Sequence, residues 1–134
     1  SSSNFKRILK HRNLKSPKKV IFGSGKIIVD LLNDENFKNI DSGTEIVSLE
    51  QLYPFPLKEI TEILKNSNLK EIFWLQEEPR NRGAWKYFNE NIIEIHENKL
   101  KLKYVGRKPS ATTATGSSSV HKIQQKRIID SILK

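Results

Sequence analysis

Two adjacent carboxylates, Glu77 and Glu78, are the residues of this sequence whose type and position most favour chemistry. They follow the apolar run 72–75, the strongest strand prediction, and open α/β sheets keep their ligand crevices at such strand ends. Neighbouring carboxyl groups in apolar surroundings can separate their pKa values for acid–base work. Successive residues of an extended chain point to opposite sides, so a catalytic dyad is not predicted, and a structural or interface role is favoured. Candidate bidentate partners for the carboxylates are Arg80, Arg82 and Arg107.

The sequence Gly-Ser-Gly-Lys at positions 23–26 lies between a predicted strand and a predicted helix, where phosphate-binding loops are found. A dinucleotide fingerprint needs a third glycine at the position of Ile28, and a P-loop needs a longer glycine-bracketed loop followed by Lys-Ser or Lys-Thr. Neither pattern is complete. We therefore predict a tight turn with unusual backbone angles, although free amides at a helix N-terminus can hold an anion weakly.

Metal ligands and catalytic nucleophiles do not form a recognisable set. The histidines His11, His96 and His121 are widely spaced, no HxxxH or HExxH arrangement is present, and the chain has no cysteine. No serine lies in a GxSxG elbow. The sequence therefore predicts no self-sufficient active site, but a small module that completes something larger.

The elements that position these residues alternate short apolar runs with amphipathic stretches, the pattern of an α/β domain. Strands are predicted at 20–22, 44–50, 72–75 and 100–104. The last is expected to be half-exposed, with lysines suited to protecting an edge of the sheet. Helices are predicted at 26–32, 57–64, 83–95 and 120–133. The polar segment 33–43 is predicted to be a loop, and the two prolines at 54 and 56 mark a rigid turn.

Length and composition fit one soluble domain of 134 residues, with 36% hydrophobic residues, a mean hydropathy of −0.58, and no apolar run near the ~20 residues of a membrane span. The net charge is +9, but residues 1–19 hold seven basic residues and no acid. The other 115 residues are nearly balanced, with 17 basic and 15 acidic residues. A basic linker or arm over 1–17, followed by a domain over 18–134, is favoured over a nucleic-acid arm, because stacking aromatic residues are few there.

Several motifs, in order along the chain, resemble the C-terminal domain of the thiamine diphosphate-dependent, decarboxylating first component of 2-oxoglutarate dehydrogenase. The most specific is QEEPRNRGAW at 76–85, and QLYPFP at 51–56 precedes it. Further matches are YVGR at 104–107, Ser110-Ala111, and ATG at 114–116 followed by Val120-His121. The resemblance covers the chain from about Lys18 to its end.

This resemblance implies a transketolase C-terminal-domain-like fold: a three-layer α/β domain with a five-stranded, mostly parallel sheet and one antiparallel edge strand. It also implies an oxidoreductase of the tricarboxylic acid cycle that decarboxylates 2-oxoglutarate and transfers succinyl to a lipoyl group. Thiamine diphosphate and magnesium would be bound outside this chain, by preceding domains of the same polypeptide. Expected partners are those domains, a second copy in a homodimer, and the lipoyl succinyltransferase, in the cytoplasm of a bacterium or in the mitochondrial matrix.

Together the motifs predict no catalytic residue here, but a polar cluster at one end of the sheet with an interface or regulatory role. A nucleotide or acyl-coenzyme A effector is a candidate ligand near it. The alternative function is a free-standing basic module that binds nucleic acid or another polyanion. The predicted cluster consists of Glu77, Glu78, Asn81, Arg107, Ser110, Thr115 and His121.

Overall fold

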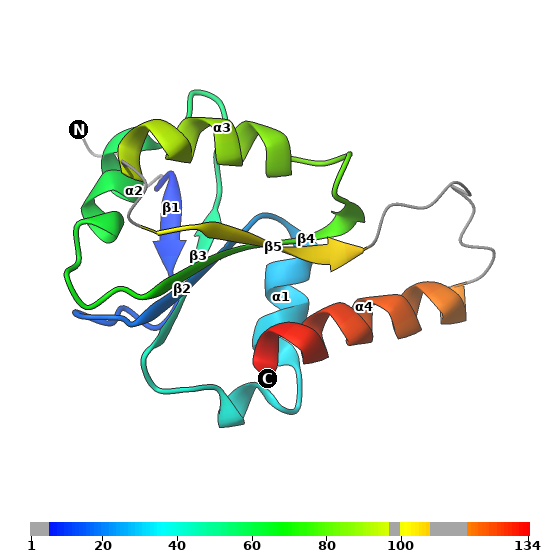
Figure 1. The fold of residues 1–134 in the computed structure, drawn as a ribbon. Helices are drawn as coiled ribbons and strands as arrows, with labels where there is room; N and C mark the ends of the chain where they lie inside the picture. The colour runs from blue at the N-terminus through cyan, green and yellow to red at the C-terminus, as the bar shows by residue number, and fades with distance from the viewer. Residues whose placement is uncertain (1–5, 97–99, 108–117) are drawn as a thin grey trace.

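The computed structural model describes residues 6–96, 100–107 and 118–134, which form a central sheet between two pairs of helices (Figure 1). The strand order is β1-β3-β2-β4-β5, with β1 antiparallel to β3 and all other pairs parallel. The strands are β1 (Ile8–Lys10), β2 (Lys19–Gly23), β3 (Thr44–Leu49), β4 (Glu71–Pro79) and β5 (Leu102–Arg107). The helices are α1 (Lys26–Asn33), α2 (Leu57–Leu64), α3 (Trp85–His96) and α4 (Ser118–Leu133). The predicted three-layer α/β fold is therefore confirmed.

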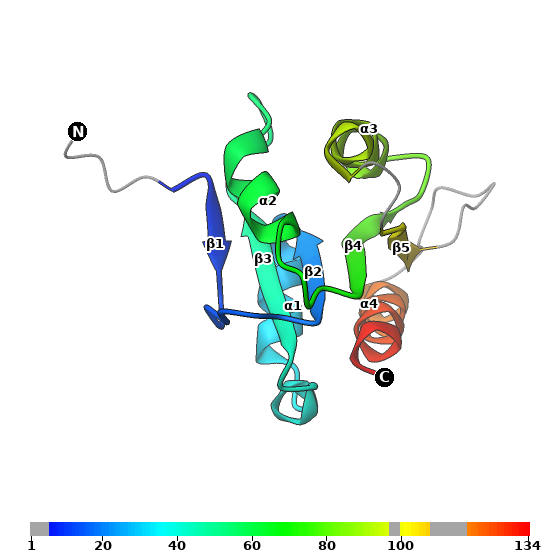
Figure 2. The same ribbon diagram turned by 60° about the vertical axis from the view of Figure 1, so that its left-hand side comes forward.

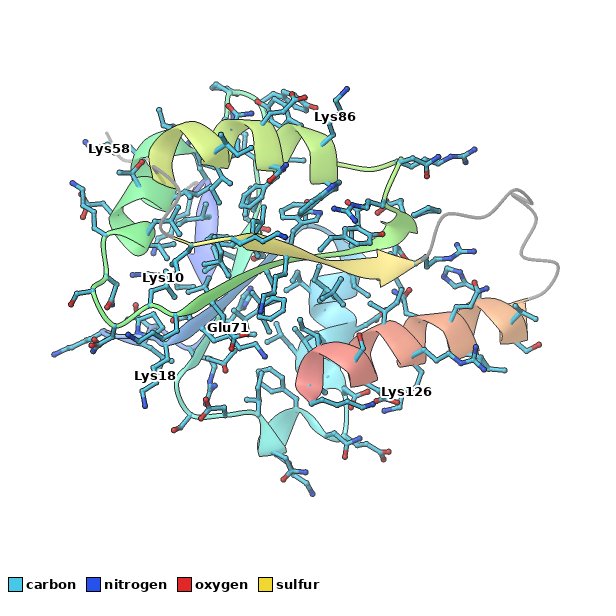
Figure 3. All side chains as sticks on the ribbon, in the orientation of Figure 1. Lys10, Lys18, Lys58, Glu71, Lys86 and Lys126 are labelled. Atoms are coloured by element: carbon cyan, nitrogen blue, oxygen red, sulfur yellow. The ribbon has the colours of Figure 1, made fainter. Side chains whose placement is uncertain are left out.

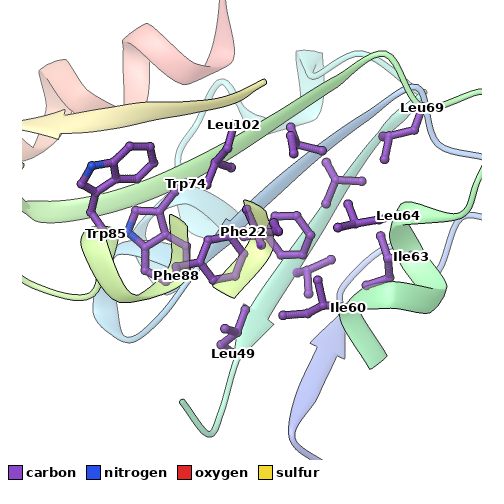
Figure 4. Packing of buried hydrophobic residues seen from close by; sticks show 14 residues of the cluster. Phe22, Leu49, Ile60, Ile63, Leu64, Leu69, Trp74, Trp85, Phe88 and Leu102 are labelled. Carbon is purple, nitrogen blue, oxygen red and sulfur yellow. The ribbon is translucent and has the colours of Figure 1, made fainter. Parts of the chain in front are cut away.

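The two faces of the sheet carry separate apolar cores. Helices α2 and α3 cover one face and α1 and α4 the other, as Figure 2 shows with the sheet between them. On the α2/α3 face, Trp74 stacks on Phe88 with ring centroids 4.5 Å apart, and Phe22 packs against Phe88 at 5.1 Å (Figure 4). Because β2 and the middle of β4 are buried on both faces, their sequences read as continuous apolar runs.

The predicted strands at 20–22, 44–50, 72–75 and 100–104 are confirmed as β2 to β5, and the four predicted helices as α1 to α4. Strand β4 is longer than predicted, since it continues through four residues to Pro79 at the sheet's end. The prediction that 33–43 is loop throughout was wrong at one point, because a short 3-10 helix forms at Phe37–Asn39.

The fifth strand comes from the N-terminal segment that the charge pattern assigns to a basic arm. Residues 8–10 pair with β3 in the register Ile8–Leu49. The buried carboxylate of Glu45 then accepts hydrogen bonds from the backbone N–H groups of Arg12 (2.9 Å) and Leu14 (2.7 Å). Part of the basic segment is thus a fixed part of the sheet and its following turn.

Candidate functional site

The predicted cluster residues that the structure describes lie where β4 and β5 end. Glu77 and Glu78 belong to the last residues of β4, Asn81 is exposed in the turn that follows, and Arg107 ends β5 in register with Pro79. His121 lies on α4. Ser110 and Thr115 lie outside the described residues.

The side chain that organises this end of the sheet is Gln76, which is 3% exposed. Its Oε1 accepts hydrogen bonds from the indole Nε1–H of Trp74 (2.8 Å) and from the backbone N–H of Trp85 (3.1 Å). Its amide nitrogen lies within hydrogen-bond distance of three backbone carbonyls and donates to them. These carbonyls belong to Glu78 (3.1 Å), Pro79 (3.0 Å) and Arg82 (2.8 Å). One buried amide thus joins the strand, the turn and the start of α3.

The turn from β4 to α3 is shaped to fit this amide. Gly83 has a φ of 69°, a conformation that L side chains rarely adopt. A Cβ atom at Gly83 would lie 2.9 Å from Oε1 of Gln76, which is too close. The turn between β4 and α3 is thus held firmly, and Trp85 at the start of α3 is buried, with 8% of its surface exposed.

The end of β4, the turn after it and the start of α3 form a corner of the domain, and Tyr104 of β5 packs against this corner. Its hydroxyl lies 2.8 Å from the carbonyl oxygen of Glu78 and 2.9 Å from that of Arg107, so it donates to this carbonyl pair. Burial raises the pKa of the Tyr104 phenol above its ordinary value. The Arg80 guanidinium lies 5.2 Å from the Trp85 ring centroid and 5.6 Å from that of Tyr104, a cation–π arrangement.

The side chain of Glu77 lies on the opposite face of the sheet from Gln76 and Tyr104, because it meets α4 in the α1/α4 layer. Its carboxylate accepts a hydrogen bond from the amide of Gln125 (3.2 Å) and lies 3.9 Å from Nε2 of His121. The same Gln125 amide also donates to Asp30 of α1 (3.1 Å), and Lys26 pairs with Asp30 at 2.9 Å. The structure therefore brings Glu77 and His121 together and joins them to α1.

Electrostatics in this layer favour the charged forms. Burial acts to raise the pKa of Asp30, but hydrogen bonds from Lys26 and Gln125 outweigh it and the pKa is lowered. One helical turn further on, Lys126 donates to the carboxylate of Asp34 at 2.7 Å, which lowers the pKa of Asp34 and raises the pKa of Lys126. Carboxylates of α1 and β4 thus anchor α4 through its polar side chains.

Glu78, Asn81 and Arg107 do not join this second layer. The first two are exposed, and the carbonyl groups of Glu78 and Arg107 meet at the Tyr104 hydroxyl. The predicted cluster therefore spans two layers that are linked through the backbone of residues 77–78. This arrangement offers anchoring and an exposed charged rim, and among the cluster residues that the structure describes no nucleophile is aligned with a general base.

The glycine turn before α1 is the tight turn that the sequence predicts. Gly25 has a φ of 78°, and a Cβ atom at Gly23 would lie 2.9 Å from the backbone oxygen of Leu75. The ammonium group of Lys26 pairs with Asp30, four residues further along α1, at 2.9 Å. Within the described residues, no three histidine or acidic side chains form a group that could hold a metal ion, and no helix is long and apolar enough to cross a membrane.

Sequence reasoning missed the roles of Gln76 and Gln125. The sequence does indicate a buried position for Gln76. Alternate residues of a strand face the same side, so Gln76 shares the face of Ile72 and Trp74, which lies in the core. Gln125 carried no such signal, because its partners Asp30 and Glu77 come from other elements.

Comparison with known proteins shows what this corner belongs to. The sequence model of the family described as "2-oxoglutarate dehydrogenase C-terminal" matches residues 1–133. Similar proteins named "2-oxoglutarate dehydrogenase E1 component" occur in Bacillus pumilus (41% identity over 119 residues, 86% of this chain and 12% of the relative) and Staphylococcus aureus (41% over 117 residues, 87% and 12%). The relative from Bacillus velezensis is 36% identical over 141 residues, which cover 99% of this chain and 15% of the relative.

The chain thus spans between about an eighth and a seventh of the length of these bacterial relatives. The motif Gln-Glu-Glu-Pro at 76–79, which first suggested the resemblance, contains the buried amide that fixes the corner and the carboxylate that holds α4. With a family match over nearly all of its residues, the chain belongs to the 2-oxoglutarate dehydrogenase C-terminal family.

Proposed function

We propose that this domain serves an enzyme that oxidatively decarboxylates 2-oxoglutarate and transfers the succinyl group to a lipoyl group in the tricarboxylic acid cycle. The observation that carries the proposal is the family match over residues 1–133, with relatives named as the E1 component of that dehydrogenase. The isolated chain is not expected to turn over. In a bacterium the enzyme would act in the cytoplasm.

The cofactors of the reaction, thiamine diphosphate and magnesium, are assigned in this proposal to the rest of the enzyme. Magnesium takes oxygen ligands, with carboxylates prominent among them. The described residues gather no three acidic or histidine side chains that could serve, so they do not fit the metal.

The role proposed for this domain is to support dimer and active-site assembly. The support lies in the corner built on Gln76, which ties β4, the turn and α3 together and fixes the exposed Glu78 and Asn81 in place. Charged side chains on a rigid frame contact a neighbouring domain with little loss of conformational entropy. Interface or regulatory contacts are therefore proposed for the predicted cluster, which includes Glu78, Asn81 and Arg107.

A domain exchange tests the proposal. Residues 1–134 replace the matching segment of the Bacillus subtilis relative, which is 40% identical over 119 residues. The chimera is expected to reduce ferricyanide in a 2-oxoglutarate-dependent manner, and the same enzyme lacking the segment is expected to be inactive. A chimera that is folded and dimeric but inactive would contradict the proposal.

Three chimeras, two variants and one control, test the interface role. Asn81→Asp and Arg107→Glu change the proposed surface, whereas Lys58→Glu changes an exposed residue of α2 (Figure 3). The first two are expected to lower the dimer fraction or the turnover number, with the Lys58 variant unchanged. Equal behaviour of all three would remove the interface role and leave the enzyme assignment intact.

A further inference from the structure

The outer side of β5 is an open edge of the sheet. β5 is the terminal strand and pairs with β4 on its other side, and no described strand pairs with its outward backbone groups. Such an edge can accept a further strand through main-chain hydrogen bonds. What decides whether it does so is the chemistry along the edge.

A groove runs beside this edge, between β5 and α3, with a volume of ≈ 350 Å³. Its apolar lining includes the buried Ile92 and Leu102, together with Ile93, whose side chain is 59% exposed on α3. The volume is at the lower end of the ~300–1,000 Å³ typical of small-molecule pockets. A few side chains of an extended segment suit it better than a whole nucleotide cofactor does.

Cations line this groove. Arg80 and Lys101 both border it, and neither takes part in the ion pairs found among the described residues. The Arg80 guanidinium is instead held over the rings of Trp85 and Tyr104. A guanidinium placed in this way keeps its N–H groups available to a carboxylate.

The alternation of β5 sets the pattern that an added strand would need. Leu102 and Tyr104 pack against the α2/α3 core, whereas Lys103 lies over Phe73 on the opposite side of the strand. An incoming strand would present every second side chain to the groove, where aliphatic residues would meet Ile92 and Leu102, and acidic residues at the border would meet Arg80 and Lys101. A basic strand would be repelled by these cations, and a neutral strand would leave them without a charged partner.

We propose that the β5 edge and the α3 groove form a docking site for an extended, acidic segment of a partner protein, which adds to the sheet as a sixth strand. The proposal goes beyond the enzyme assignment and does not depend on it. Charge complementarity at Arg80 and Lys101, the apolar groove and the open edge carry it together.

The test uses this chain and the peptide acetyl-Val-Thr-Val-Thr-Glu-Thr-Glu-amide, which presents both valines and both glutamates on one face. Affinity is measured by calorimetry and the contacts by amide NMR shifts. Saturable binding with shifts over 102–107 is expected. Ile93→Asp and Arg80→Gln should each weaken binding about tenfold. The matched control is Ile123→Asp on α4, where the isoleucine is 53% exposed, and it should leave the affinity within about twofold.

Three results would overturn the proposal. The lysine counterpart of the peptide could bind equally well, which would remove the charge argument. A peptide N-methylated at alternate residues could bind equally well, which would mean a small-anion site without strand addition. Sedimentation could show that two copies of the chain associate and that Ile93→Asp dissociates them, which would make the edge a self-interface. None of these results bears on the dehydrogenase assignment.

Discussion

At the scale of single residues, the amide of Gln76 connects more elements than any charged residue of the predicted cluster. It satisfies two buried donors, on Trp74 and Trp85, and three carbonyls at the end of β4 and in the following turn. Buried polar groups that lose a partner keep their full desolvation cost. The Gln76 side chain therefore sets the stability of the corner on which the exposed charges stand.

Gln76→Leu is expected to lower the free energy of unfolding by about 3 kcal/mol, because several buried groups lose their partner at once. Gln76→Glu should be at least as damaging, since a carboxylate oxygen would then face the three carbonyls that now accept from Nε2. Urea denaturation followed by circular dichroism measures both. The control is Gln51→Leu, where the amide makes one local bond to Tyr53, and a small effect is expected.

Two glycines give an independent check of the same corner. Gly83→Ala and Gly25→Ala both place a side chain at positive φ, which costs about 1–2 kcal/mol. At Gly25 no atom lies within 4 Å of the added Cβ, whereas at Gly83 the Cβ also collides with Gln76. Gly83→Ala should be the more destabilising of the two, and in the Gln76→Leu background the difference should shrink. If the two substitutions lower the free energy of unfolding equally in the wild-type background, neighbouring atoms move to relieve the Gly83 contact without cost.

At the scale of elements, α4 is held by two different kinds of contact. Its C-terminal part buries Ile128, Ile129 and Ile132 in the core shared with α1, whereas its middle is held by polar side chains. Gln125 bridges Asp30 and Glu77, and Lys126 bonds Asp34, whose side chain is 7% exposed. The docking of the middle of α4 therefore depends on carboxylates being ionised.

This dependence predicts a loss of stability in acid. The pKa of Asp34 is lowered in the folded chain, chiefly by the hydrogen bond from Lys126, so its contribution is present above the unfolded value near ~4 and is lost as pH falls through the folded value. Urea midpoints between pH 6 and pH 2 measure it. Asp34→Asn should be less stable than the wild type at pH 6, and the gap should close below pH 4.

The control for this titration is Glu62→Gln, which removes an ion pair with Lys65 in which both side chains are mostly exposed. Exposed pairs contribute little, so this variant should follow the wild type at every pH. If the Asp34→Asn and wild-type curves stay parallel down to pH 2, the Asp34–Lys126 contact does not anchor α4.

The sequence predicted the longer elements because each carries its own periodic signal. The run of apolar residues in β4 and the stripe Ile60, Ile63, Leu64 in α2 are local patterns. β1 has three residues and lies in a segment dominated by lysine and arginine, so it has no such pattern. Its structure follows from pairing with β3 and from the buried Glu45, contacts that span more than 30 residues and that no local pattern encodes.

The candidate site was predictable to a similar extent. The strand end at Glu77 and Glu78 and the tight glycine turn before α1 followed from residue types and spacing. The division of the cluster into two layers did not, because it arises where α4 folds back onto α1 and β4.

At the scale of the whole molecule, the fold shows that part of the +9 net charge stabilises the domain itself. Part of the basic N-terminal segment is built into the sheet, where Arg7 donates to the carbonyl of Phe55 at 2.6 Å and Arg12 to that of Thr44 at 2.7 Å. Those guanidinium groups are used for structure. Lys10, Lys15 and Lys18 remain exposed on the surface.

We therefore expect no retention of DNA or RNA at ~0.15 M salt, because a few exposed lysines without stacking aromatic residues give weak, salt-sensitive contacts. Fluorescence anisotropy with a labelled single strand at 0.05 and 0.15 M salt measures this. Deleting residues 1–19 is a poor control, because the deletion removes β1 and exposes the edge of β3. The triple variant Lys10→Gln, Lys15→Gln, Lys18→Gln keeps the strand and removes the charges. Binding that persists at 0.15 M in the wild type and disappears in the triple variant would establish a polyanion-binding function of the folded domain.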